Sequence, residues 1–337
     1  MVGINGIDAL ADLPAESIDR VEVITAPSAR YQAEGSSGIV NIILVKNTLK
    51  GLNGVFNISG GKFDSYGANA SLNYKVGKFN FFTNSGYGDN TDMGGAFQEN
   101  TYTPVGNYDK FYETRSFDRR RVGNNVNFGV DINLAQKTKL TFFYVINDRD
   151  GEDISENQQN HTLIIENKTL SLRSEIEKDK DISKQLSFTL THKFNEVGHN
   201  LDVTFQTERV VEDEFSDLQT QTFLPIKALG FLEENNTKER KKQFLAQIDY
   251  VFPIDKNTQF EAGYRTTNEY LDTSFMVLNE ITGGTIVVDE DLTNFLDYEQ
   301  SIHAFYSQFG KKWNSFSFLA GLSCLLYTSD AADEVVS

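Results

Sequence analysis

Cysteine, proline and long apolar runs are all scarce in this chain. The single cysteine, Cys324, excludes a disulfide framework and a thiolate metal site within the chain. No stretch approaches the roughly 18 apolar residues of a membrane-spanning helix. A strand that crosses a membrane in a β-barrel needs only about 9–11 residues with alternate ones apolar. The lack of an apolar run therefore excludes helical spans and leaves a transmembrane barrel open.

Basic residues are also few. The 31 Lys and Arg are outnumbered by 48 Asp and Glu, and the formal net charge is -17. Phosphate backbones require a basic face, so we expect no nucleic-acid partner. Acidic residues gather at 148–156 and 210–217, where such charge runs predict solvated loops. The first ten residues lack a basic region followed by an apolar run, so the protein is cytoplasmic or its N-terminus is missing.

Strict alternation of apolar and polar residues is the main pattern that is present. In residues 126–134 and 140–146 every second side chain is apolar, and a short polar turn separates the two runs. Successive side chains of a strand point to opposite faces, so the pattern predicts a hairpin with one apolar and one polar face. The apolar face contacts either a protein core or lipid.

The same alternation recurs along the chain from residue 51 and predicts roughly eleven antiparallel strands. Near residue 304 it predicts that Ile302, Ala304 and Tyr306 share the apolar face. The predicted strands centre on residues 51–60, 66–76, 79–81, 126–134, 140–146, 186–190, 201–205, 244–252, 260–264, 302–306 and 316–320. The stretch 162–177 fits an extra hairpin within a loop.

The connections between these strands differ in length in a regular way. After the first connection, short turns alternate with long polar loops, which are expected near residues 89–118, 149–182, 213–238 and 276–294. An outer-membrane barrel has short periplasmic turns and long extracellular loops, whereas a soluble sandwich has no reason to sort its loops. The polar face is rich in Asn, Ser, Thr and Gly, which predicts a wide, wet lumen.

Four aromatic residues lie close to the short turns. They are Tyr74, Phe194, Phe252 and Trp313. This position suits an aromatic girdle at one membrane interface, and ordinary strand aromatics are an equal alternative.

The first fifty residues carry a different pattern. Residues 18–24 predict a short strand, a turn-rich segment follows, and residues 39–46 are apolar nearly throughout, which predicts cover on both faces. The stretch LPAESIDRVEVITAPSARYQAEGSSGIVNIILVK resembles the end of the plug domain of TonB-dependent outer-membrane receptors. The residues that carry this plug motif are Pro14, Val21, Val23, Pro27, Tyr31, Gly35, Gly38 and Asn41.

The resemblance implies a fold and a function. The fold class would be all-β: a transmembrane antiparallel β-barrel, partial, about half of a 22-strand barrel, preceded by the end of an α/β plug domain. Residues 1–50 would be the C-terminal part of the plug and residues 51–323 the first half of the barrel. The protein would lie in the cell outer membrane. It would admit a scarce substrate such as an iron chelate, glycan or peptide when the TonB complex pulls on the plug. Its partners would be that substrate, outer-membrane lipid and the TonB complex, which would bind through a missing N-terminal segment.

The chain departs from this family at both ends. The N-terminal half of the plug and about half of the barrel strands are missing, so we expect a fragment. Residues 324–334, CLLYTSDAADE, match an in-frame translation of a sequencing-library adapter. We therefore expect residues 324–337 to be an artefact and the genuine protein to end near Leu322 or Ser323.

Other functions remain to be weighed. Alternatives are a passive outer-membrane porin or adhesin barrel, and a soluble extracellular β-sandwich with a dry core. No catalytic motif is present, and His192 and His199 fit exposed positions at a turn, so we expect neither an enzyme nor a cofactor or metal site. Residues 148–153 could bind calcium, but solvated loop charge fits better. Residues 87–113 could hold a sugar or chelate, but a solvated loop fits better.

Overall fold

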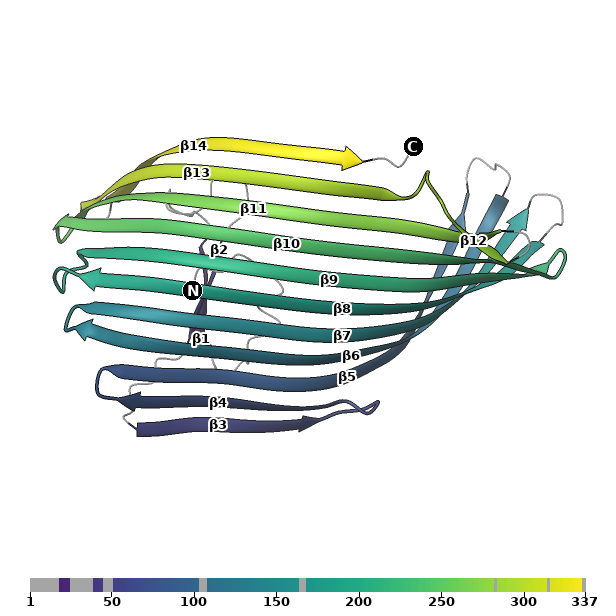
Figure 1. Cartoon of the computed structure of the whole chain (residues 1–337), viewed down its shortest axis with the longest axis horizontal. Coiled ribbons are helices and arrows are strands. Elements are labelled where there is room, and N and C mark those ends of the chain that lie inside the picture. The colour runs from purple at the N-terminus through teal and green to yellow at the C-terminus, as the bar shows by residue number, and fades with distance from the viewer. Residues whose placement is uncertain are drawn as a thin grey trace.

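All regular structure in the described residues is β-strand. The computed structural model describes residues 18–24, 39–44, 51–102, 108–163, 168–281, 284–313 and 316–334. These residues form a hairpin of two strands and one large antiparallel sheet (Figure 1). Within these ranges no helix is long and apolar enough to cross a membrane.

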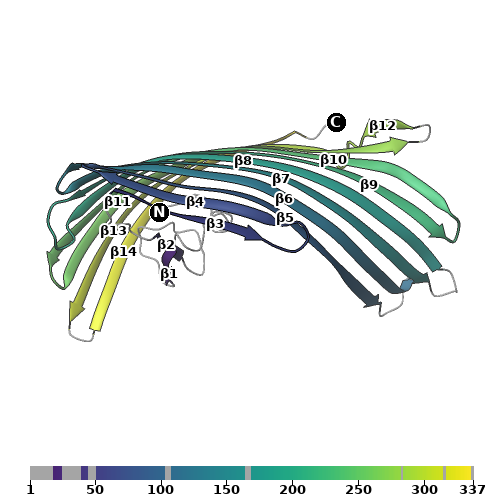
Figure 2. The same ribbon diagram turned by 90° about the horizontal axis from the view of Figure 1, so that it is seen from below.

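The hairpin contains the part of the plug motif that the structure describes. Strand β1 (Ile18–Ile24) pairs antiparallel with β2 (Ile39–Leu44), with Val21 opposite Ile42. Both strands were predicted from the sequence. The predicted cover on both faces of residues 39–46 concerns side chains outside the described set. The hairpin lies beneath the large sheet, on the side toward which the sheet curves (Figures 1 and 2).

The large sheet is a meander in which each long strand pairs with the next. Its strands are β3 (Gly51–Gly60), β4 (Tyr66–Val76), β5 (Phe79–Thr101), β6 (Tyr108–Ala135), β7 (Thr138–Leu163), β8 (Lys168–Lys193), β9 (Asn200–Leu224), β10 (Ala228–Asp255), β11 (Thr258–Ile281), β12 (Thr285–Val288), β13 (Asn294–Trp313) and β14 (Phe316–Glu334). The short β12 pairs with β11 beside the main path. The main path contains the eleven strands that alternation predicted. Its edges are β3 and β14, and no pairing among the described residues closes the sheet.

Three of the long loops predicted from polarity, near residues 89–118, 149–182 and 213–238, are wrong, because these residues are mostly strand. The fourth, 276–294, contains the short β12 and the irregular residues 289–293. Strands β7 and β8 each have 26 residues, and β10 has 28. At about 3.4 Å per residue, a strand of 26 residues is about 88 Å long. Only about 9–11 residues are needed to cross a bilayer. The acidic runs at 148–156 and 210–217 therefore lie on strands β7 and β9. Residues 168–177 lie in the first part of β8, which is paired with β7, and do not form a separate hairpin.

The tight turn between β4 and β5 shows how the short connections form. Gly77 has φ +55° and is followed by Lys78 before β5 begins. Glycine adopts positive φ at little cost, so the chain reverses within two residues.

Cross-strand register places the apolar residues of all these strands on one face. Val130 lies opposite both Phe81 and Phe142, and Phe188 lies opposite both Phe142 and Phe205. Most buried side chains lie on the other face. Side chains crowd most on the concave side of a curved sheet, so we assign this face to the inside of the curve. We call these the outer and inner faces.

The predicted orientation of β13 is wrong. Tyr264 of β11 lies opposite Phe305, and Phe260 lies opposite Phe309, so the outer face of β13 carries Phe305 and Phe309. Ile302 and Tyr306 consequently point inward, where they are only 7% and 6% exposed. Alternation alone misassigned them because β13 has apolar residues on both faces.

Three inner-face glycines each lie opposite an aromatic ring on the next strand. The directly paired residues are Gly129 with Phe82, Gly263 with Tyr306, and Gly94 with Phe117. A Cβ atom on any of these glycines would overlap the facing ring. The rings can therefore lie over the glycine backbone, so the side chains project less from the inner face at these points.

Candidate functional site

The outer face near the short turns carries a continuous band of apolar side chains, which are exposed or half-buried. Phe188 is 42% exposed, Phe205 48% and Phe305 59%. We call the full set of these outer-face side chains the apolar band. Its members are Leu72, Tyr74, Val76, Phe79, Phe81, Val126, Phe128, Val130, Ile132, Leu140, Phe142, Tyr144, Ile146, Leu186, Phe188, Leu190, Leu201, Val203, Phe205, Phe244, Ile248, Tyr250, Phe252, Phe260, Tyr264, Phe305 and Phe309. Soluble monomers rarely expose apolar patches larger than a few hundred Å².

The height of this band fits a membrane. It spans about ten residues along each strand, or about 30 Å, which is close to the thickness of the hydrocarbon core. In the part of the chain that the structure describes, no second sheet covers the band. A dry sandwich core, the soluble alternative, therefore has no counterpart here.

The four predicted girdle residues all lie at the short-turn end of the outer face. Tyr74, Phe194, Phe252 and Trp313 are between 40% and 49% exposed. Trp313 packs 5.5 Å from the ring of Phe318. His199 was expected to be exposed but is half-buried, 4.2 Å from the ring of Phe194. An aromatic cluster at the end of an apolar band is typical of a membrane interface.

The inner face is polar and hydrogen-bonded between strands. Asn57 donates to Asn69 at 3.1 Å, and Asn73 donates to Asn80 at 2.9 Å. Farther along the sheet, Thr191 donates to Asp202 at 2.7 Å. Water or a polar occupant can satisfy such a surface, whereas an apolar filling would leave its donors and acceptors unpaired.

The densest part of this inner face lies on β9 to β13. Gln206, Gln247, Asp249, Tyr306 and Gln308 are each at most 6% exposed. Gln247 donates to Asp249 at 2.9 Å, and the Tyr306 hydroxyl donates to the same carboxylate. Alternation along the sequence does not reveal this cluster, because it assigns Tyr306 to the apolar face. The signal that was available is the second apolar alternation, Phe305 and Phe309, on the same strand.

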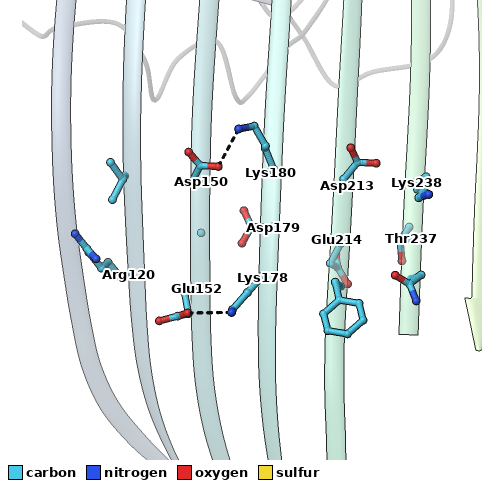
Figure 3. A pocket seen from close by; sticks show the side chains of 14 residues that line it. Arg120, Asp150, Glu152, Lys178, Asp179, Lys180, Asp213, Glu214, Thr237 and Lys238 are labelled. Atoms are coloured by element: carbon cyan, nitrogen blue, oxygen red, sulfur yellow. Dashed lines mark ion pairs between the residues drawn. The ribbon is translucent and has the colours of Figure 1, made fainter. Parts of the chain in front are cut away.

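Beyond the apolar band, the strands carry rows of opposite charges. An open groove of about 460 Å³ lies over β6 to β10 in this region (Figure 3). Lys180 lies 3.5 Å from Asp150, and Lys178 lies 3.8 Å from Glu152. These pairs join β7 to β8 far from the turn that connects them, so they favour continued strand pairing where loops were predicted.

Another ionic contact joins β5 to β6 and to Tyr66, the first residue of β4. The Arg120 guanidinium donates to both carboxylate oxygens of Asp89, at 2.9 and 2.6 Å, and the Tyr66 hydroxyl donates at 3.0 Å. Asp89 is 2% exposed. Because the carboxylate has three donors, it is a satisfied structural group.

The residues proposed as a calcium loop, 148–153, lie on β7, and Asp150, Glu152 and Asp153 each pair with a cation of a neighbouring strand. Asp153 accepts from Arg119 at 2.5 Å, and Arg149 is paired with Asp181. Across the described ranges, no group of three or more His, Cys, Asp or Glu is arranged to hold a metal ion. Residues 87–113 are also mostly strand, in β5 and β6, which corrects the loop prediction there.

Acidic residues crowd the inner face beyond the band. Burial raises the pKa of the Glu177 carboxyl, and the nearby carboxylates of Glu214 and Asp153 raise it further. Burial also raises the pKa of Glu214, with added repulsion from Asp179 and Asp181. Both shifts have the cause expected for carboxylates gathered away from water.

The predicted plug residues are described only in part. Val21 and Val23 lie on β1 and are 50% and 69% exposed. Asn41 lies on β2, opposite Glu22. Pro14, Pro27, Tyr31, Gly35 and Gly38 lie outside the described residues.

Comparison with known proteins agrees with the geometry of the outer face. Residues 192–331 match a family described as the outer membrane protein beta-barrel family. The match runs from the end of β8 into β14 and includes the densest part of the inner face. No curated protein matches the chain significantly. The protein is thus similar to outer-membrane β-barrels over this region, and it is located in the outer membrane.

Proposed function

We propose that this chain is part of a TonB-dependent receptor, which admits a scarce substrate across the outer membrane when its plug is pulled. The observation that carries the proposal is the hairpin of β1 and β2 on the concave side of a barrel-like sheet (Figure 2). The strands of that hairpin contain Val21, Val23 and Asn41 of the plug motif. A plug must lie inside the curve of the wall, and the hairpin has this position.

The polar inner face supports the same proposal. Buried side chains such as Gln206 and Gln247 each keep one polar atom without a hydrogen-bond partner among the described residues. A polar plug surface or water would supply the missing partners. The proposal gives the chain no catalytic role and no resident cofactor. Its partners would be outer-membrane lipid, the TonB complex and a substrate such as an iron chelate, glycan or peptide.

Barrel closure is part of the proposal. A sheet with free edges at β3 and β14 leaves backbone donors and acceptors without partners in lipid, which costs several kcal/mol per group. We propose that further strands complete a wide barrel. Eleven strands on the main path are about half of the 22 in plugged transporters.

A passive porin is the second candidate, because the apolar band and the polar inner face suit any outer-membrane channel. The two candidates differ in conductance. We expect the full-length protein in planar bilayers to remain closed, and a variant lacking residues 18–44 to conduct steadily. A steady open channel in the unaltered protein would instead support the porin.

Energy dependence separates the two candidates again. Uptake of candidate iron chelates, glycans and peptides should stop in cells that lack the inner-membrane TonB complex. Uptake that continues unchanged in those cells contradicts the proposal. For the conductance test, the matched control to the deletion of residues 18–44 replaces Pro225, Ile226 and Lys227, between β9 and β10, with serine. This change leaves residues 18–44 intact, so the variant should stay closed.

A further inference from the structure

Three cations form a row on the outer face, at the edge of the apolar band. Lys184 of β8 lies opposite Arg209 of β9, which lies opposite Lys242 of β10. We call these three residues the cation row. Neighbouring strands are about 4.8 Å apart, so the backbone positions of the three cations lie within about 10 Å. All three side chains are exposed.

The cation row differs from the charges farther along the same strands. Lys178 and Lys180 each lie within 4 Å of a carboxylate, and Arg240 lies 2.6 Å from Asp213. Among the described residues, none of the three row members has an ion pair. Lys242 lies 5.9 Å from the ring of Tyr270, and Asp148 is diagonal to Lys184 without forming an ion pair. Three adjacent unpaired cations repel one another, so an anion would stabilise them.

The position of the row selects the kind of anion. On the side of the short turns, Leu186 and Phe244 of the apolar band come next along β8 and β10. On the other side, Ile182 and Val211 come next along β8 and β9, and Arg240, which is paired with Asp213, comes next along β10. The short turns of outer-membrane barrels face the periplasm, so the row lies near the outer leaflet. A ligand with an anionic head and acyl chains would contact the row and the band together.

We propose that the cation row binds the phosphate groups of an acylated glycolipid of the outer leaflet, whose acyl chains lie on the apolar band. The long stems of Lys184 and Lys242 can cover apolar surface while their ammonium groups reach the head-group level. Arg209, in the centre, presents planar donors that suit a phosphate. This inference needs only the outer-membrane location, and it holds whether the barrel is a gated receptor or a porin.

The test is binding of diphosphorylated lipid A by the full-length protein in a zwitterionic detergent, measured by native mass spectrometry. The variant K184Q/R209Q/K242Q should bind it on the order of tenfold more weakly. The matched control K178Q/K180Q/K238Q removes three charges farther from the band and should bind like the wild type. Heat-modifiable migration on gels checks that each protein is folded. The single variant R209Q serves if the triple variant does not fold.

Two further probes identify the source of the phosphate. The same lipid A without its phosphates should bind the wild type as weakly as phosphorylated lipid A binds the row variant. Inorganic phosphate at millimolar concentration should not displace the phosphorylated lipid. Equal binding of phosphorylated and dephosphorylated lipid overturns the proposal, as does equal binding by the wild type and the row variant. Full displacement by inorganic phosphate also overturns it, because the site would then not require acyl chains.

Discussion

At the scale of single residues, the inner face depends on small side chains beneath large ones. Gly263 lies directly opposite Tyr306, and a Cβ atom at this position would overlap the Tyr306 ring. The Tyr306 hydroxyl in turn donates to Asp249 on β10. One glycine thus allows a contact that links three neighbouring strands.

Replacing this glycine should destabilise the protein. We expect Gly263→Ala to lower the free energy of unfolding by about 1–3 kcal/mol, because Tyr306 must leave its position or strain the backbone. The measurement is the guanidinium unfolding midpoint of the folded protein in detergent. Gly60→Ala is the control, since nothing lies within 4 Å of the added atom there. Equal midpoints for the two variants would show that the ring does not depend on the glycine.

The acidic inner face beyond the band makes a prediction about pH. Glu177 and Glu214 have pKa values raised by burial first and by like charges second. A carboxyl with a raised pKa in the folded state stabilises that state below the ordinary Glu pKa of about 4.3 and loses this contribution as the pH rises through the raised value. The parts of β8 and β9 that lie beyond the apolar band should therefore exchange amide hydrogens faster at pH 7 than at pH 4, after correction for intrinsic exchange. The variant E177Q/E214Q should lose most of this difference. An unchanged difference would place the pH dependence elsewhere.

At the scale of strands, each crossing segment has two environments. Phe188 points outward in the apolar band, and its neighbour Thr189 points inward, where its hydroxyl lies 3.4 Å from that of Thr204. Both residues lie near the middle of the segment of β8 that crosses the membrane. A charge should therefore have very different effects at the two positions.

We expect Phe188→Arg to destabilise the folded protein by about 2–4 kcal/mol, the cost of a basic residue near the bilayer midplane. Thr189→Arg, the matched control one residue away, should change stability much less, because its side chain faces a polar surface. Folding into lipid vesicles, followed by heat-modifiable migration, measures both. A similar loss in the two variants would mean that the inner face is not wet.

At the scale of the whole molecule, the sheet must cross the bilayer at a defined height. The apolar band covers only the part of each strand near the short turns, and the charged extensions continue beyond it. The single tryptophan, Trp313, marks the short-turn boundary, and it is 49% exposed. It can therefore report the depth of that boundary without a label.

Brominated lipids should quench Trp313 most strongly when the bromines lie near the glycerol backbone. The reason is that the residue lies at the interface, beyond the end of the hydrocarbon region. A variant that carries F188W and W313F moves the tryptophan to mid-band and should be quenched best by bromines deep in the acyl chains. The same depth profile for both proteins would contradict the proposed height of the band.

Much of the fold could be predicted from residue order. The existence and order of the eleven strands on the main path, the two strands β1 and β2, and the girdle positions of Tyr74 and Trp313 were all expected. The predicted loops at 149–182 and 213–238 failed because polarity reports contact with water and does not report an irregular backbone. Pairing of Lys180 with Asp150 across 30 positions of sequence has no local signal.

The plug motif shows a similar division. Its two strands could be predicted, whereas the gating function and the adapter origin of residues 324–337 stay predictions. The cation row shows the same division between what the sequence predicts and what the structure decides. Lys184, Arg209 and Lys242 each look like an ordinary surface residue in their own strand, and only register brings them together.

The sequence by itself determined that this protein forms strands with one apolar face, because side chains alternate along every strand and that alternation is local. Only the tertiary structure decided which face β13 presents, how far the strands continue beyond the band, and which charges meet. Each of these depends on the register between strands. A shift of one residue would turn every side chain of a strand to the other face, and residues far apart in the sequence decide between the two arrangements.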